Sequence, residues 1–82
     1  MPKKMQSDQF VIGKLKQLSE KFSGIMIRYE FRKSTQSHIV EVLPLIVFKE
    51  NEQYIDEEVK LETEFDQLYP SENLVFISED SL

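Results

Sequence analysis

Apolar residues near the start of the chain recur with the period of a helix. Spacings of four, three and four residues place them on one stripe of the helix surface. These residues are Val11, Leu15, Leu18 and Phe22. Ser7 or Asp8 can cap the first turn, and Gly24 favours the left-handed conformation that ends many helices. The pattern predicts a helix over about residues 8–23.

Residues 25–32 then alternate between two faces, one of them wholly apolar, which is typical of a strand with one buried face. The apolar positions are Ile25, Ile27, Tyr29 and Phe31. Residues 34–37 are polar and turn-like, and residues 39–48 form the most apolar run of the chain, so the sequence predicts a hairpin. Pro44 has no N–H group for a strand ladder, so we expect the second strand to lie at an edge or to bulge there.

The pairing of these two strands has two solutions. A four-residue loop at 34–37 sets Glu30 opposite Glu41, with Arg28 and Arg32 on the diagonals of Glu41. A shift of two residues sets Glu41 directly opposite one of these arginines. We expect the first register, because the diagonal arginines offset the repulsion of the two glutamates, and the second register stays open.

The second half of the chain contains another helical pattern. Asp56 can cap its first turn, acidic residues follow, and Pro70 ends it. The apolar arc comprises Val59, Leu61, Phe65, Leu68 and Tyr69. We expect this helix over about residues 56–69, with a start as early as residue 52 also open. Residues 74–77 are apolar on both faces, which is typical of a strand inside a sheet.

The order of elements predicts an α+β fold, a two-layer α-β-β-α-β sandwich. A crossover through the second helix makes the second and third strands parallel. With the first strand in the centre, the small mixed three-stranded sheet has the order 2-1-3, and both helices lie on one face. We expect a single domain over residues 1–82, with residues 1–6 and 78–82 as flexible tails.

Composition narrows the class of protein. The 82 residues include no cysteine, so disulfides and thiolate metal sites cannot stabilise this small core, which favours association of copies. The absence of cysteine also fits a reducing compartment. No apolar run approaches the roughly 20 residues that span a bilayer. We therefore expect a cytoplasmic protein without membrane contact.

Charge is distributed unevenly along the chain. Residues 1–33 carry eight basic and three acidic side chains, a net charge of +5, whereas residues 34–82 carry two basic and twelve acidic side chains, a net charge of −10. The overall charge of −5 disfavours nucleic acid, whose phosphates it repels. The basic residues that could touch phosphates are Lys14, Lys21, Arg28, Arg32 and Lys33. The asymmetry marks either an acidic binding surface or neighbouring elements of opposite charge.

No residue pattern indicates an enzyme, a metal site or a cofactor. His38 falls at a strand start beside a polar loop, where we expect it to be solvated, and Glu41 points to the other strand face. The acidic residues of the second helix lack the glycine and the spaced oxygen ligands of a calcium loop. The competing hypothesis is a small-ligand or catalytic site that forms in an oligomer around His38, Tyr29 or Arg28.

An exposed apolar row is the feature that most favours an interaction. If both helices cover one face of the sheet, this row lies on the other face. The predicted interface comprises Met26, Arg28, Ile39, Glu41, Leu43, Leu45 and Val47. If Pro44 introduces a bulge, the last two residues turn inward instead. We expect a homodimer through this face or through the edge of the second strand.

The second helix predicts a further binding surface, because its acidic side chains would attract a basic protein partner. This acidic face comprises Glu57, Glu58, Glu62 and Asp66.

Overall fold

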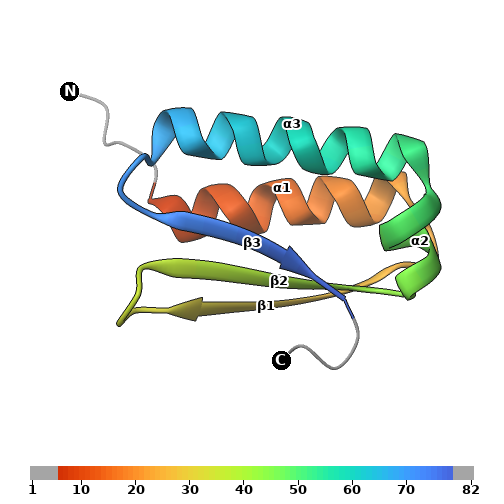
Figure 1. The fold of residues 1–82 in the computed structure, drawn as a ribbon, viewed down its shortest axis with the longest axis horizontal. Helices are drawn as coiled ribbons and strands as arrows, with labels where there is room; N and C mark the ends of the chain where they lie inside the picture. The colour runs from red at the N-terminus through yellow and green to blue at the C-terminus, as the bar shows by residue number, and fades with distance from the viewer. Residues whose placement is uncertain (1–5, 79–82) are drawn as a thin grey trace.

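The computed structural model describes residues 6–78. The elements are α1 (Ser7–Lys21), β1 (Met26–Arg32), β2 (Ser37–Leu43), α2 (Leu45–Glu50), α3 (Glu52–Leu68) and β3 (Asn73–Ile77). The predicted α+β class and the mixed three-stranded sheet are confirmed. The long helices α1 and α3 run in opposite directions over the same face of the sheet (Figure 1).

The sheet has the order β1-β2-β3, so the predicted order 2-1-3 is wrong. β2 pairs antiparallel with β1 and parallel with β3, and the parallel pairing is the predicted one. The reason lies in the helices: α1 contacts β1 and α3 contacts β3, so the chain returns on the far side of β2. β3 is therefore an edge strand rather than an inner strand. β2 pairs with β1 on one side and with β3 on the other, so it has no free edge for the predicted dimerisation.

The hairpin adopts the shifted register. Arg28 lies opposite Glu41, so the like-charge register is wrong by two residues. The loop between the strands sets this register. Arg32 and Ser37 are the last paired residues, and Gln36 in the loop between them has a positive φ of 53°. A direct pair of opposite charges replaces two opposed glutamates, which favours this register.

Pro44 ends β2 and begins a helix, so it lies neither in an edge strand nor at a bulge. Its carbonyl accepts a hydrogen bond from the Val47 amide at 3.1 Å, and the peptide bond between Leu43 and Pro44 is cis. The apolar run continues as α2, which the sequence does not reveal because short apolar runs fit helix and strand alike. Leu45 and Val47 therefore leave the sheet, and Val47 packs against the core.

The core lies between the sheet and the two long helices. Its buried members are Phe10, Val11, Leu15, Leu18, Val40, Val42, Tyr54, Leu61, Phe65 and Tyr69. The predicted stripe of the first helix is thus confirmed at three positions, and Phe22 packs against the core. Val59, predicted in the buried arc of the second helix, is 56% exposed.

Both ends of the described chain differ from the prediction in detail. Gln6, not Ser7 or Asp8, is the N-cap of α1, since the Ser7 hydroxyl bonds to Glu72 instead. Ser78 donates its hydroxyl to a backbone carbonyl of β2. The rest of the predicted tails lies outside the described residues.

Candidate functional site

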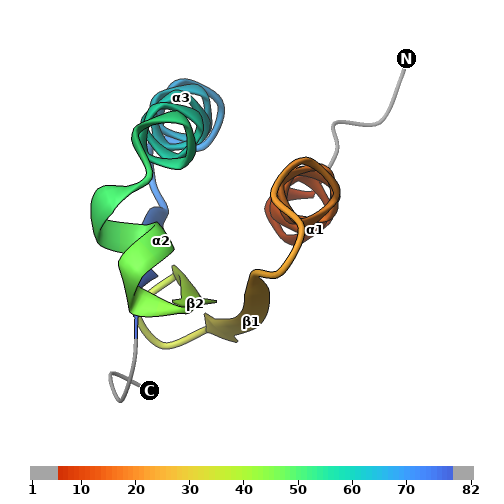
Figure 2. The ribbon, with the colours of Figure 1, turned by 90° about the vertical axis from the view of Figure 1, so that its right-hand side faces the viewer.

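The face of the sheet opposite α1 and α3 is covered by no described helix (Figure 2). Strand alternation places five of the seven predicted interface residues on it. These are Met26, Arg28, Ile39, Glu41 and Leu43. Leu45 and Val47 lie on α2 instead. β3 adds Val75 and Ile77, which the sequence does not assign to a face because residues 74–77 are apolar on both sides of the strand.

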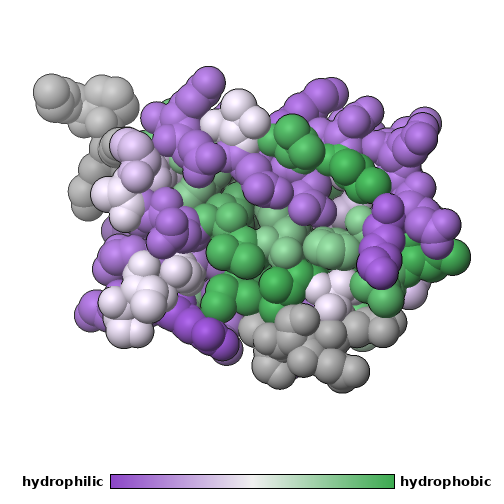
Figure 3. Space-filling model, in the orientation of Figure 1, coloured by the Kyte–Doolittle hydropathy of each residue, from purple (hydrophilic) through white to green (hydrophobic). Residues whose placement is uncertain are grey.

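The apolar side chains of this open face come from all three strands. Met26 lies opposite Leu43, and Ile39 lies opposite Val75. Met26 is 65% exposed and Val75 is 42% exposed, while the others are partly buried. Figure 3 shows hydrophobic atoms gathered where β3 crosses the molecule, below α3. We call Met26, Ile39, Leu43, Val75 and Ile77 the apolar band.

A salt bridge lies within the apolar band. Arg28 Nη1 donates to Glu41 Oε1 at 3.0 Å, and the Glu41 side chain is only 3% exposed. A buried carboxylate needs such a partner, because an unpaired one costs several kcal/mol. The Arg28 side chain is 64% exposed, so its guanidinium remains accessible at the surface.

His38 is fully buried, so the prediction of a solvated histidine is wrong. Its Nδ1 lies 2.5 Å from the Tyr29 hydroxyl and its Nε2 lies 2.7 Å from Glu72 Oε1. The rings of Phe31 and Phe65 pack on it, with centroids 4.6 and 5.3 Å away. Glu41 points to the opposite face, as predicted. Both ring nitrogens are engaged within the protein, and the aromatic rings exclude water.

The hydrogen bonds of His38 continue to α1. Ser7 Oγ donates to Glu72 Oε1 at 2.7 Å. Burial opposes ionisation of Glu72, but the hydrogen bonds from Ser7 and His38 outweigh it and hold the pKa below its usual value. Burial, with the carboxylates of Asp8 and Glu72, raises the pKa of Tyr29 to about 12. Tyr29 therefore stays protonated, and the four groups tie α1, β1, β2 and the start of β3 together.

The predicted acidic face of the second helix is divided between two sides of α3. Glu57 points toward α1, where Lys21 Nζ lies 2.9 Å from its Oε2, and Lys60 adds a contact at 3.7 Å. The hydrogen bond from Lys21 holds the pKa of Glu57 below its usual value. Glu58 and Glu62 follow the buried Tyr54 at intervals of four residues, so they lie on another side of the helix than Glu57. Asp66 is exposed.

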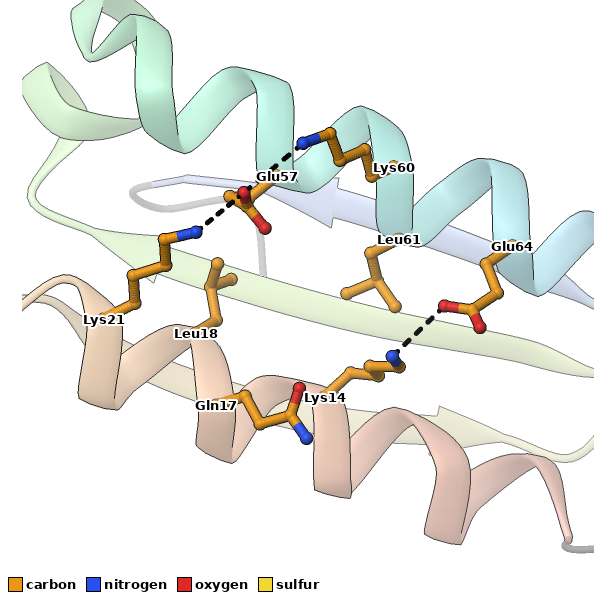
Figure 4. Close-up of a pocket in the computed structure, with 8 residues that line it drawn as sticks. All are labelled: Lys14, Gln17, Leu18, Lys21, Glu57, Lys60, Leu61 and Glu64. Atoms are coloured by element: carbon orange, nitrogen blue, oxygen red, sulfur yellow. Dashed lines mark hydrogen bonds and ion pairs between the residues drawn. The ribbon is translucent and has the colours of Figure 1, made fainter.

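A groove of about 320 Å³ separates α1 from α3 (Figure 4). Two ion pairs cross it, Lys21 with Glu57 and Lys14 with Glu64, the latter at 3.2 Å. Its lining comprises Lys14, Gln17, Leu18, Lys21, Glu57, Lys60, Leu61 and Glu64. Lys14 and Lys21 are thus bound by glutamates of α3, and Arg28 projects from the opposite side of the sheet. The fold does not assemble these cations into one basic patch.

Tyr54 is a further buried residue, and the sequence pattern does not single it out. Its side chain is fully buried, with its ring 5.7 Å from that of Phe22 and 6.3 Å from that of Phe48. Its hydroxyl is buried beside the Glu58 carboxyl, and a hydrogen bond couples the two groups. Burial raises the pKa of Glu58 to about 7, against the opposing effect of the hydrogen bond from Tyr54, and the neighbouring Glu62 acts in the same direction as burial.

Within residues 6–78, no three histidine, aspartate or glutamate side chains are placed to share a metal ion. No helix of the described chain is long and apolar enough to cross a membrane. Comparison of the sequence with protein-family models and curated proteins, and of the fold with solved structures, gives no match.

Proposed function

We propose that this protein is a small protein-binding domain that self-associates through the sheet face that its long helices leave open. The apolar band on that face is the observation that supports this function. A sheet with one face on the core usually presents polar residues to water on the other. Here five positions from three strands are apolar instead.

A two-fold dimer would use the apolar band twice. In such a symmetric interface the same patch of each copy contributes, so each exposed side chain is buried in duplicate. Complete burial of a side chain the size of methionine or valine stabilises by roughly 1.5–3 kcal/mol. Met26 and Val75, the most exposed members of the band, are therefore the anchors that we expect to dominate the association.

Charged residues of β1 lie beside the band and would form its rim. Arg32 and Glu30 pair at 2.6 Å, with about half of each side chain exposed. Such a polar rim fixes orientation and affects the rate of association more than the affinity. We propose a cytoplasmic location as well, supported by the absence of cysteine from the sequence.

Molar mass in solution tests this function through matched substitutions. Met26→Glu places a charge in the apolar band, and Ile12→Glu places one at another exposed apolar position, on α1. We expect light scattering to give a dimer for the wild type and for Ile12→Glu, unchanged at about 1 M salt, which screens surface charges. Met26→Glu should be a folded monomer, with the circular dichroism of the wild type.

Two results would refute the proposed function. One is a wild-type protein that remains monomeric at high protein concentration. The other is a Met26→Glu variant that keeps the dimeric mass.

A further inference from the structure

We propose that the outer edge of β3 binds an extended segment of a partner protein, in which lysine or arginine residues alternate with apolar residues. The segment adds a fourth strand to the sheet, antiparallel to β3. This inference rests on the protein-binding part of the proposed function, but it does not require self-association.

The outer edge of β3 has backbone groups to offer. Within residues 6–78, β3 pairs with β2 and with no other strand. The Asn73 amide donates to the Gln36 carbonyl at 3.0 Å, on the side of β2. Because successive residues of a strand direct their N–H and C=O groups to opposite sides, Leu74 and Phe76 direct theirs outward. These residues present two donors and two acceptors to another chain.

The two edges of the sheet differ in how they resist such pairing. β1 carries Arg28, Glu30 and Arg32, and charged side chains on an edge strand discourage a further strand. β3 has the sequence Asn-Leu-Val-Phe-Ile, without a charged residue or a proline. Figure 3 shows hydrophobic atoms along the course of this strand. We therefore expect the added strand at β3 and not at β1.

A strand added at this edge has different surroundings on its two faces. Leu74 and Phe76 pack against the core, on the side of the long helices, whereas Val75 belongs to the apolar band of the open face. The side chains of the added strand alternate between the same two faces. Those on the open face extend the apolar band, so we expect them to be apolar.

The side of α3 that lies above this edge is acidic. Glu57 and Glu64 line the groove toward α1. The side of the helix away from α1, about half a turn further round, comprises Ile55, Val59, Glu62 and Asp66. Since α1 contacts β1 and α3 contacts β3, this side faces the outer edge of β3.

Charge complementarity selects the occupant of the edge. No lysine or arginine of the described chain forms an ion pair with Glu62 or Asp66. Basic side chains on the helix side of the added strand supply the missing charge, and their apolar stems pack on Ile55 and Val59. The β3 strand of a second copy brings only apolar side chains to this position. A basic segment of a partner protein therefore fits the edge better than a second copy does.

Amide hydrogen exchange measured by NMR tests the added strand residue by residue. The probe is the peptide Lys-Val-Lys-Val-Lys, acetylated and amidated at its ends. In the free protein we expect the Leu74 and Phe76 amides to exchange faster than those of Asn73 and Val75, which face β2. Saturating peptide should slow exchange at Leu74 and Phe76 by about tenfold or more.

Two methylated peptides test the direction of the added strand. In an antiparallel strand, the residues with side chains on the helix side direct their N–H groups toward β3. N-methylation of the three lysine residues should therefore abolish binding, because it removes these donors. N-methylation of the two valine residues, whose N–H groups point away from the sheet, should leave binding unchanged.

Charge variants connect the binding to α3. Asp66→Asn should weaken binding of the peptide about threefold, because it removes an exposed carboxylate beside the edge. Glu20→Gln removes an exposed carboxylate of α1 and should bind the peptide like the wild type. A peptide with glutamate in place of each lysine should not bind.

Three results would overturn the proposal. These are unchanged exchange at Leu74 and Phe76 with the peptide in excess, equal affinity of the two methylated peptides, and protection of these amides that rises with protein concentration alone. The last result would place a second copy at the edge.

The Met26→Glu variant separates this site from the proposed dimer interface, and we expect it to bind the peptide with wild-type affinity. Dimerisation without peptide binding would refute the partner segment alone. Peptide binding by a wild-type protein that never dimerises would refute the dimer alone.

Discussion

Glu58 occupies a position in the core-facing stripe of α3 where an apolar residue would stabilise the fold more. Burial, with the charge of Glu62, raises its pKa from 4.5 to about 7. Because the pKa is higher in the folded protein, protonation of Glu58 favours folding. Its stabilising contribution is complete below about pH 4.5 and is lost as the pH rises through about 7.

Glu58→Gln should therefore change the pH dependence of stability. At about pH 8 we expect the variant to unfold at higher urea concentration than the wild type, with a gain on the order of 1 kcal/mol after solvent screening. At about pH 4 the gain should vanish, since both side chains are then neutral. Glu20→Gln serves as the control. A gain of the same size at both pH values would contradict the assigned role of burial.

His38 shows which properties of a single residue the sequence leaves open. Its position beside a polar loop favours exposure, yet it is fully buried. The burial depends on Tyr29 and Glu72, which lie 9 and 34 residues away in the chain and occupy both ring nitrogens. The pattern of neighbouring residues in the sequence does not indicate such distant hydrogen-bond partners. By contrast, Glu41 could be assigned to the opposite face from strand alternation alone.

At the scale of elements, local periodicity predicts α1 and β1, because each presents one apolar face over several residues. The apolar run over residues 39–48, which Pro44 interrupts, contains no such alternation of faces. Its first part completes β2 and its second part forms α2, since Pro44 cannot donate to the ladder and its carbonyl accepts from the next helical turn. The early start of α3, left open by the sequence, follows from Asn51, whose side chain accepts from the Tyr54 amide at 3.0 Å.

Asn51→Ala should destabilise the protein by about 1 kcal/mol, because the substitution removes this cap from α3. Urea unfolding monitored by circular dichroism measures the change. Gln53→Ala, at an exposed position two residues further on, should change stability by less than about 0.5 kcal/mol. Equal stability of Asn51→Ala and the wild type would show that α3 does not need the cap.

At the scale of the whole molecule, the sequence predicts the two layers and the shared face of the two long helices. It does not predict the order of the strands, which depends on how α1 and α3 lie over the sheet. Nor does it assign Val75 to the open face, because residues 74–77 are apolar on both sides and only the register with β2 decides which of them face outward. The uneven charge of the chain has a partly structural explanation, since Lys14 and Lys21 of the basic half pair with Glu64 and Glu57 of the acidic half.

The central claim is that two copies meet through the open face of the sheet, and intermolecular contacts measured by NMR test it most directly. In a mixture of isotope-labelled and unlabelled protein, isotope-filtered nuclear Overhauser spectra detect only contacts between copies. We predict contacts from the methyl groups of Met26 and Val75, and none from Ile12 of α1. Contacts confined to Ile12 or to Val59 of α3, with none from Met26 or Val75, would contradict the claim.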